Sequence, residues 1–283
     1  LVMTYKRIMV PLNGLDDPRH ALAIAFDLGR RFEGEVVGMH AEVDTASSLP
    51  YMGESMSGAL VETMIANMDN ATGQRRNIAK AAFEAAQQAA GSEGKAGMGS
   101  FVVYQGQEDD LLAWHGRLAD LVVVGRPEDA SALNESPTIH AAIMETGRPV
   151  LVAPPGETKT LGRNIMIAWN GSPQAVRAIA AALPLLQEAE AITLLSIEEG
   201  GIDGPPAAEA VDYLAAHGCQ AQAVALSKGH GTVGDTLLLA AHNEGADLMV
   251  MGAYTHNRIR QFIFGGATLE ALLDATIPVL MAH

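Results

Sequence analysis

Two stretches of the sequence, ADLVVVG at residues 119–125 and ADLMVMG at residues 246–252, are nearly identical and decide the fold. Each is a short, continuous apolar run that ends in glycine, which is typical of a strand buried on both faces of a parallel sheet. Their offset is 127 residues (246 − 119), so they stand at corresponding places in two halves of the chain. Internal repetition of this kind indicates the architecture before any single motif is considered.

Two more pairs of segments repeat in the same order around these stretches. KRIMVPLNG at residues 6–14 corresponds to RNIMIAWNG at residues 163–171, and RPVLVA at residues 148–153 corresponds to IPVLMA at residues 277–282. The offset is 157 for the first pair, so the first half carries about 30 additional residues (157 − 127). These additional residues fall between residues 44 and 91.

The pattern predicts an α/β protein with two tandem domains, residues 1–155 and residues 160–283. Asp17-Pro18 and Ser172-Pro173 predict helix starts, because an N-cap residue precedes a proline in the first turn. A short polar linker, PPGETK, connects the two domains. Strands are expected near residues 6–12, 35–41, 98–104, 119–125 and 149–153, and again near 163–169, 191–197, 219–225, 246–252 and 278–282.

The additional residues of the first half predict a lengthened second helix. Residues 59–90 are rich in alanine and other helix formers, and a loop at residues 47–57 precedes them. The segment carries four adaptable apolar side chains: Met52, Met56, Met64 and Met68. We expect them to pack into the core, and a lid or partner surface is the alternative.

The composition excludes several functions. A net charge of −15 argues against nucleic acid and anionic membrane surfaces as partners, although a local basic patch could still bind a small anion. The single cysteine, Cys219, cannot form an internal disulfide and fits a reducing compartment. Because there is no apolar run of membrane-spanning length and no secretory leader, we expect a cytoplasmic protein.

The repeated segments together resemble the universal stress protein (UspA-like) family. The first strand ends in Asn170-Gly171, the Ala-Asp-Leu strand ends in Gly252, a loop leads to Gly265-Gly266, and a Pro-Val-Leu strand follows. Because both halves share the order, the chain resembles a tandem member of that family. The resemblance implies two doubly wound, Rossmann-like domains, each a five-stranded parallel sheet of order 3-2-1-4-5 with helices on both faces.

The resemblance also implies a nucleotide site in the second domain, where the first and fourth strands end. Nucleotide-binding members carry glycine, two residues, glycine, nine residues, glycine, and then serine or threonine. Gly252 and Gly265 match this pattern, whereas Thr255 and Gly266 depart from it. The implied nucleotide-binding residues are Ala168, Trp169, Asn170, Gly252, Thr255, His256, Arg258, Gly265, Gly266 and Ala267.

The departures have unequal physical consequences. Gly266 loses one hydroxyl hydrogen bond, worth about 1 kcal/mol, whereas Thr255 is costly if its position requires positive φ. Arg258 suits phosphate, and a solvated surface charge is the alternative. Asn13 and Asn170 stand where ATP-binding members usually have aspartate, so each either meets an adenine edge or only forms the turn into the next helix.

The first domain lacks the glycines of a phosphate loop. Residues 126–146 contain none, and Ser136-Pro137-Thr138 stands where those glycines would be. Proline also removes a backbone donor. The sequence therefore predicts a degenerate nucleotide site in this half.

The leading hypothesis is a stress-response protein that is not an enzyme and senses ATP or AMP, with Mg²⁺, in its second domain. An interaction module of the same fold that binds no nucleotide is the alternative. Slow hydrolysis of ATP would need Mg²⁺ and an acid or a water-positioning group, and only Asp203 and Asp235 stand near enough to be considered. No phosphate-loop, nucleophile-elbow or zinc motif is present, so no catalytic or metal residue is assigned.

The last strand of each half predicts how the domains associate. In this family such strands pair antiparallel between two domains. Residues 149–153 and 278–282 are therefore expected to pair within the chain, which would make the molecule a pseudo-dimer and leave a further homodimer open. Such pairing covers two sheet edges that otherwise invite aggregation.

Overall fold

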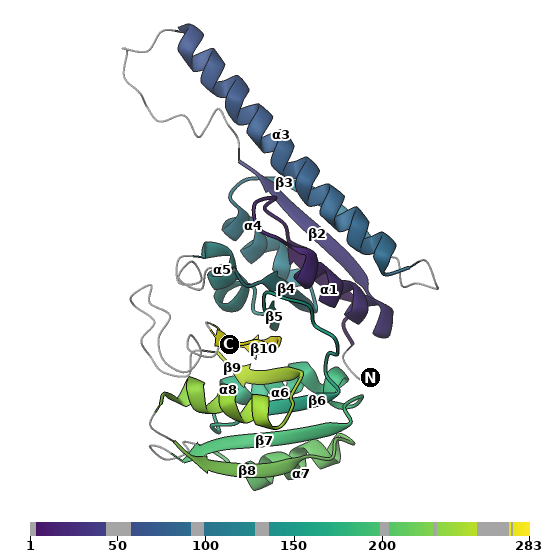
Figure 1. The fold of residues 1–283 in the computed structure, drawn as a ribbon, viewed down its shortest axis with the longest axis vertical. Coiled ribbons are helices and arrows are strands. Elements are labelled where there is room, and N and C mark those ends of the chain that lie inside the picture. The colour runs from purple at the N-terminus through teal and green to yellow at the C-terminus, as the bar shows by residue number, and fades with distance from the viewer. Residues whose placement is uncertain are drawn as a thin grey trace.

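The chain forms one continuous ten-stranded sheet that runs through both halves (Figure 1). The computed structural model describes residues 4–43, 58–91, 99–127, 136–198, 204–228, 231–253, 272 and 274–283. The strand order is β3-β2-β1-β4-β5-β10-β9-β6-β7-β8. Each half therefore has the expected order 3-2-1-4-5, and the expected fold class is confirmed.

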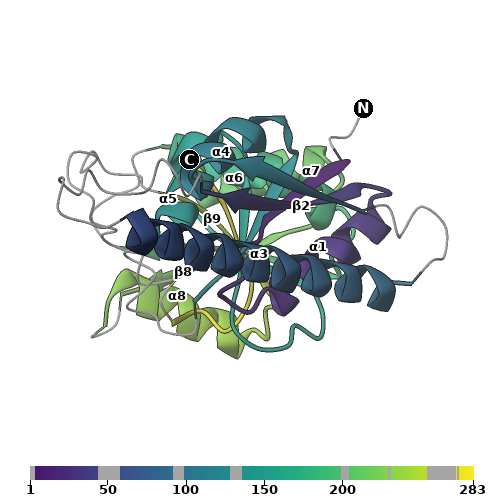
Figure 2. The same cartoon turned by 90° about the horizontal axis from the view of Figure 1, so that it is seen from above.

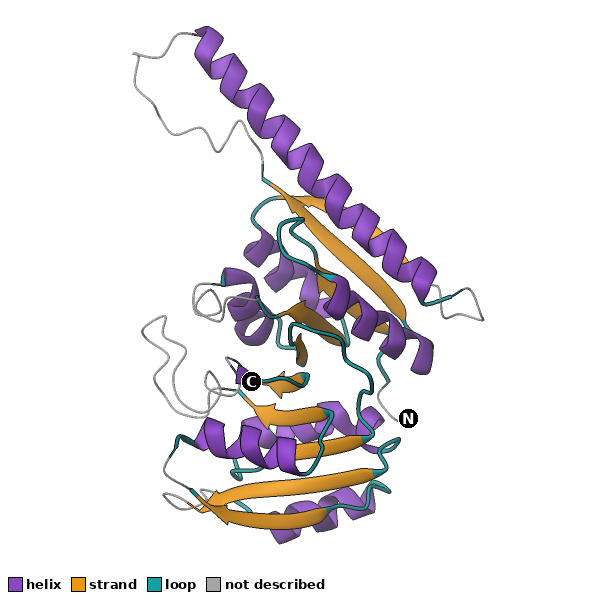
Figure 3. Ribbon diagram, in the orientation of Figure 1, coloured by secondary structure: helices purple, strands orange, loops and turns teal. Residues whose placement is uncertain are grey.

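The elements follow the expected alternation of strand and helix (Figure 3). The first half contains β1 (Arg7–Pro11), α1 (Arg19–Arg31), β2 (Glu35–Glu42), α3 (Gly58–Ala89), β3 (Gly99–Gln105), α4 (Glu108–His115), a 3-10 turn (Gly116–Leu118), β4 (Leu121–Gly125), α5 (Pro137–Glu145) and β5 (Val150–Ala153). The second half contains β6 (Asn164–Ala168), α6 (Pro173–Leu186), β7 (Ala191–Glu198), α7 (Ala207–Ala216), β8 (Gln222–Ser227), α8 (Val233–Asn243), β9 (Leu248–Gly252) and β10 (Val279–Ala282).

One strand begins later than the sequence predicts. β8 begins at Gln222 rather than near residue 219, because the end of α7 occupies the intervening residues. Gly218 has a φ of +81°, and the Cys219 amide donates to the Leu214 carbonyl at 2.9 Å. This left-handed glycine and the bond that follows it terminate the helix in the usual way.

The two halves of the sheet join through an antiparallel pair of strands, β5 and β10. Val152 lies opposite Val279, Leu151 opposite Leu280, and Val150 opposite Met281. Every other strand pair in the described part of the chain is parallel. The pairing expected between residues 149–153 and 278–282 is therefore present. The proposed limits of the two domains, 1–155 and 160–283, stay a prediction.

The strands divide the core into two layers because their side chains alternate between the faces of the sheet. In β4, Leu121 and Val123 face a cluster built with α1, α3, α6 and α7, whereas Val122 and Val124 face a cluster built with α4, α5 and α8. Both faces are therefore covered, which explains why these strands are apolar along their whole length.

The aspartate of each repeated Ala-Asp-Leu stretch has a structural task that the sequence did not reveal. The carboxylate of Asp120 accepts hydrogen bonds from the Lys6 and Arg7 amides at 2.8 and 2.9 Å. The Asp247 carboxylate accepts from the amides of residues 162–164 at 3.0 to 3.1 Å. In both halves this residue fixes the start of the first strand beside the fourth.

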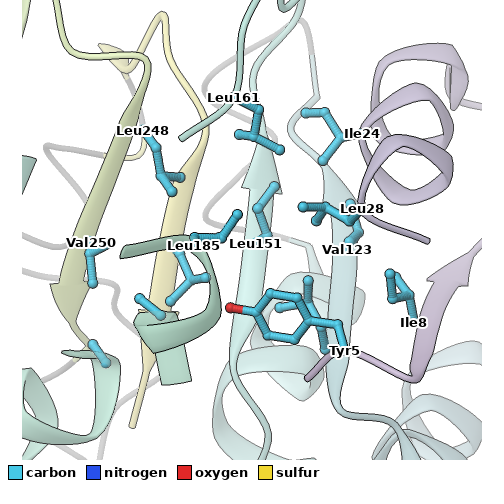
Figure 4. Close-up of a cluster of buried hydrophobic side chains, with 14 of the residues drawn as sticks. Tyr5, Ile8, Ile24, Leu28, Val123, Leu151, Leu161, Leu185, Leu248 and Val250 are labelled. Atoms are coloured by element: carbon cyan, nitrogen blue, oxygen red, sulfur yellow. The ribbon is translucent and has the colours of Figure 1, made fainter. Parts of the chain in front are cut away.

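Side chains from both halves meet at the junction (Figure 4). The buried Tyr5 ring packs edge-on against Phe32, and its hydroxyl donates to the Ala181 carbonyl in α6 at 2.7 Å. Arg31 also spans the junction. Its guanidinium donates to Glu188 at 2.8 Å and to the Leu161 carbonyl at 2.8 Å.

The lengthened helix expected at residues 59–90 is confirmed as α3, which extends well past the sheet and lies beside α1 (Figures 1 and 2). Among the side chains of α3 whose burial is described, Ala79 and Phe83 are buried. The expected core packing of Met64 and Met68 is not found, since both are only half-buried. Met52 and Met56, with the loop at residues 47–57, lie outside the described residues.

No helix in the described part of the chain is both long and apolar enough to cross a membrane.

Replacing Tyr5 by phenylalanine tests the bond between the halves. Tyr5→Phe keeps the buried ring and removes the hydroxyl, so it should lower the free energy of unfolding by about 0.5–1.5 kcal/mol. Tyr213→Phe is the control, because Tyr213 is 40% exposed and its change should have an effect within about 0.5 kcal/mol. Urea unfolding of both variants measures the difference, and equal stabilities would show that the Tyr5 hydroxyl does not hold the halves together.

Candidate functional site

The second half has a topological switch point between β6 and β9. These strands run parallel with Ala168 opposite Met251, and the chain leaves them in opposite directions, toward β7 and toward β10. Asn170 follows the end of β6 and Gly252 ends β9. The structure therefore places these two predicted site residues at neighbouring carboxyl ends, where doubly wound sheets bind their ligands.

Two of the predicted site residues also have clear structural tasks. Trp169 is 5% exposed, and its Nε1–H donates to the Pro205 carbonyl at 3.0 Å. Asn170 is exposed, and its Oδ1 accepts from the Ser172 amide at 3.2 Å. With Gly171 at a φ of +71°, this geometry forms the turn into α6. The turn interpretation of Asn170 is therefore supported, while its exposed side chain stays able to meet a ligand.

Gly252 is required by the packing of the second half. A Cβ atom built on it would lie 2.6 Å from the Ala175 amide nitrogen and 2.8 Å from Gln174, both in the first turn of α6. The strand end therefore presses directly against the helix start. This close approach gives Gly252 a structural role whether or not a ligand binds beside it.

Thr255, His256, Arg258, Gly265, Gly266 and Ala267 lie outside the described residues, and their role stays a prediction. Ala168 is half-buried at the end of β6. Of the two acids considered for hydrolysis, Asp203 is also outside the described residues.

The other of these acids, Asp235, caps a helix. Its carboxylate accepts from the Thr232 amide at 2.9 Å, and its own amide donates to the Thr232 hydroxyl at 3.1 Å. The hydrogen bonds from Thr232 lower the pKa of Asp235 below its ordinary value. This capping box explains the residue without a catalytic role.

The equivalent position in the first half holds a crevice of about 440 Å³. It lies beyond the ends of β1 and β4 and includes Gly14, Gly125 and the start of α5. Ser136 caps α5, because its hydroxyl accepts from the Ile139 amide at 3.3 Å. The sequence suggested only a lost phosphate loop here. The signal that it did not use was Ser136-Pro137, which marks a helix start in the same way as Ser172-Pro173.

Both acids and bases line this crevice: Asp16, Asp17, Glu108, Arg126 and His20. Asp16 accepts from the Asn13 amide group at 2.7 Å, and Asp17 pairs with Arg19 at 2.5 Å. The hydrogen bond from Arg19 lowers the pKa of Asp17 to about 2. The Asn13 Oδ1 also accepts from the Leu15 and Asp16 amides at 2.8 and 3.0 Å, so its side chain helps to shape the loop.

Glu108 is the acid of the crevice whose pKa is raised. It lies half-buried at the start of α4 and accepts from the Thr138 hydroxyl at 2.8 Å. Burial raises the pKa of Glu108 above its ordinary value, and the nearby carboxylates of Asp16 and Asp109 raise it further. Thr138 and His40 act in the opposite direction. The structure thus keeps a carboxyl group in a position where its charged form is costly.

His40 lies in the wall behind the crevice. It is 2% exposed, its Nδ1 lies 2.5 Å from the Leu12 carbonyl oxygen, and its ring stacks on Phe101. Leu12 belongs to the crevice lining, so His40 fixes the backbone at the end of β1. Among the described residues, no cluster of His, Cys, Asp or Glu is arranged to hold a metal ion.

The geometry defines the general class of the protein. Switch points between β1 and β4 and between β6 and β9 are characteristic of doubly wound α/β proteins that bind ligands beyond their strand ends. The family follows from the sequence comparison, in which residues 162–283 match the model of the universal stress protein family. This part of the chain belongs to that family.

Solved structures with the same fold span nearly the whole chain. A universal stress protein from Archaeoglobus fulgidus DSM 4304 matches 98% of this chain and 95% of its own length, with a TM-score of 0.68 and 14% identity. A functionally unknown protein from Pseudomonas aeruginosa PAO1 matches 98% and 92%, with a TM-score of 0.52 and 14% identity. At this identity the likeness shows the fold alone. No curated protein matches the chain at a significant level of sequence similarity.

Alanine substitutions at the equivalent glycines test the packing difference between the two strand ends. Gly252→Ala should cost about 1–3 kcal/mol of stability, because its Cβ would overlap the backbone of α6. Gly125→Ala is the matched control. Its Cβ would lie 3.9 Å from the nearest atom, an ordinary contact, so a change within about 0.5 kcal/mol is expected. Equal losses in thermal and urea unfolding would refute the argument.

Proposed function

We propose that this protein is a universal stress protein that is not an enzyme and that binds an adenine nucleotide, ATP or AMP, in its second domain. Occupancy of that site would report the nucleotide state of the cytoplasm to a regulatory partner. Mg²⁺ would accompany the phosphates and supply positive charge, and no protein group is assigned to hold it.

The observation that carries the proposal is the meeting of Asn170 and Gly252 at one switch point inside the part of the chain that belongs to the family. In an open α/β sheet, this is where a ligand finds both strand ends and a helix start. α6 begins there at Pro173, behind its Ser172 cap, and contributes the positive end of its dipole. The sequence adds Gly265 and Gly266 to the same loop region.

A second candidate is an interaction module of the same fold that binds no nucleotide. The observation that favours it is that predicted site residues already have structural roles within the protein. The Trp169 indole is buried with its N–H bonded to Pro205, and Gly252 is explained by its contact with α6. Thr255 in place of the second motif glycine points in the same direction.

Calorimetric titration with ATP and Mg²⁺, and separately with AMP, tests the proposal. Binding of about one equivalent with micromolar affinity is expected, and Gly265→Asp should abolish it by placing a carboxylate among the phosphates. Gly73→Asp in the middle of α3 is the control, since it adds the same charge in the other half and should leave binding unchanged. An absence of heat and of any thermal shift with both nucleotides would refute the proposal in favour of the interaction module.

Restoring the motif provides a test in the opposite direction. The double change Thr255→Gly and Gly266→Ser recreates the full glycine pattern, so it should tighten nucleotide binding by about 5-fold or more, the equivalent of one hydrogen bond of about 1 kcal/mol. Unchanged affinity in the double variant would show that this loop does not contact the phosphates. Two bound equivalents in the original protein would show that the first half also binds nucleotide.

A further inference from the structure

The last helix of the first half is closed by a residue of its own. The hydroxyl of the buried Thr146 donates to the Ala142 carbonyl in α5 at 2.6 Å and accepts from the Arg148 amide at 3.1 Å. A Cβ atom built on Gly116 would lie 2.8 Å from the Thr146 methyl carbon, so this methyl group fits only because residue 116 is glycine. The carbonyls at a helix end need donors, and in this half the side chain that ends the helix provides one.

The last helix of the second half lacks this hydroxyl. RPVLVA at residues 148–153 and IPVLMA at residues 277–282 are 129 positions apart, so Ala275 stands where the first half has Thr146. Ala275 is buried and directly follows Asp274, which is helical. Its methyl side chain can neither donate to the helix nor accept from the chain that follows. A donor for this helix end therefore has to come from another part of the protein or from water.

Arg126 of the first half provides such a donor. Its Nη2 donates to the Ala275 carbonyl at 3.1 Å in a partly buried bond. Arg126 directly follows β4, and its amide donates to the Ala153 carbonyl at the end of β5 at 2.8 Å. The backbone of Arg126 is thus fixed beside the strand that pairs with β10, which brings the guanidinium within reach of the other half.

The charge of Arg126 suits this position. The carbonyl end of a helix carries a partial negative charge and attracts a cation. A charged donor also makes a stronger hydrogen bond than a neutral one. Burial lowers the pKa of Arg126, and the Asp274 carboxylate opposes this shift. The helix end and the acid beside it therefore both favour the charged guanidinium.

The contact runs in one direction. Ala253 stands 127 positions after Arg126, and its amide makes the equivalent bond to the last strand, but its side chain is a methyl group. It has no donor to offer to the end of α5, which Thr146 already closes. The first half therefore holds the last helix of the second half, and Ala253 cannot return the bond.

We propose that Arg126 is a positioning residue for the ligand site of the second half, because it anchors, from the first half, the helix that ends at Asp274. The sequence predicts that this helix begins after Gly265-Gly266, the proposed phosphate contact. The effect on nucleotide affinity rests on the proposed function, whereas the anchoring does not. Arg126 also lines the crevice of the first half, so one side chain links the regions of both switch points.

Titration with AMP, and with ATP and Mg²⁺, tests the effect on affinity. Arg126→Met keeps an alkyl stem and removes the donors, so it should weaken nucleotide binding by about 5-fold or more, the equivalent of one hydrogen bond. Methionine also removes a half-buried charge, so the variant should fold. Retained affinity in Arg126→Met would overturn the proposal.

Two variants control for a general loss of packing. Arg148→Met is the matched control, because the Arg148 guanidinium donates to the Arg117 carbonyl at 2.7 Å within the first half. Tyr5→Phe removes a different hydrogen bond between the halves. Both should bind nucleotide as the original protein does. Equal weakening in these variants and in Arg126→Met would overturn the proposal.

A serine at position 275 should rescue the loss. In Arg126→Met combined with Ala275→Ser, the helix end regains a hydroxyl of its own, as α5 has in Thr146. Serine is preferred to threonine because the residue 127 positions after Gly116 is Asn243, which leaves less room for a methyl group. Affinity should return to within about 2-fold of the original value. A neutral hydroxyl cannot replace a lost charge, so rescue identifies capping of the helix as the cause, and failure of rescue would overturn the proposal.

Hydrogen–deuterium exchange without nucleotide separates this proposal from the proposed function. Amides at residues 272–283 should exchange at least about 3-fold faster in Arg126→Met and at the original rate once the serine is added. Residues 142–153 should be unchanged in both variants. If the original protein binds no nucleotide, faster exchange still supports the anchor while the nucleotide site fails. Unchanged exchange at residues 272–283 would overturn the anchor whatever the nucleotide result.

Discussion

The antiparallel contact between β5 and β10 is the interaction on which the rest of the molecule depends. Each half ends in an apolar strand of four residues, VLVA in β5 and VLMA in β10, that is buried along its whole length. An unpaired strand of this kind would expose a row of backbone donors and acceptors to other chains. Pairing the two strands satisfies those groups and makes one sheet of ten strands from two sheets of five. The buried Tyr5 hydroxyl and the Arg31 guanidinium then bond across an interface that the strands have already set.

Much of this architecture could be predicted because it depends on local pattern. A parallel strand buried on both faces must be apolar throughout, so repeated runs such as ADLVVVG and ADLMVMG identify equivalent strands directly. The start of α6 could be predicted for a similar reason, since Ser172-Pro173 specifies both a cap and the first turn. The start of α1 differs from the prediction, because Pro18 is the N-cap residue and makes no side-chain capping bond. The late start of β8 was not predictable from apolar pattern, because Cys219 is apolar in character and belongs instead to the end of α7.

The features that the sequence could not predict depend on how elements far apart in the chain are arranged in space. The helical composition of α3 was evident, but the half-burial of Met64 and Met68 depends on what packs against the helix, and composition contains no such information. The crevice of the first half was missed because it was sought through glycines. Its shape arises from the divergence of the chain at the switch point, which parallel strand order produces with any residues in the loops. Likewise, Asp120 and Asp247 look like surface acids in sequence, although each holds the start of a strand.

The two halves share backbone geometry but differ in the side chains at equivalent positions. The Arg126 amide donates to the Ala153 carbonyl at 2.8 Å, and the Ala253 amide, 127 residues later, donates to the Ala282 carbonyl at 2.9 Å. The backbone geometry at these equivalent positions is therefore the same, while one side chain is a guanidinium and the other a buried methyl group. The neighbouring glycines differ in their surroundings. Gly125 has space beside it, whereas Gly252 lies in contact with α6. Since the sheet alone fixes the strand ends, the loops and helix starts are free to diverge. A duplicated domain can in this way keep its packing interface constant while the chemistry at its two switch points separates.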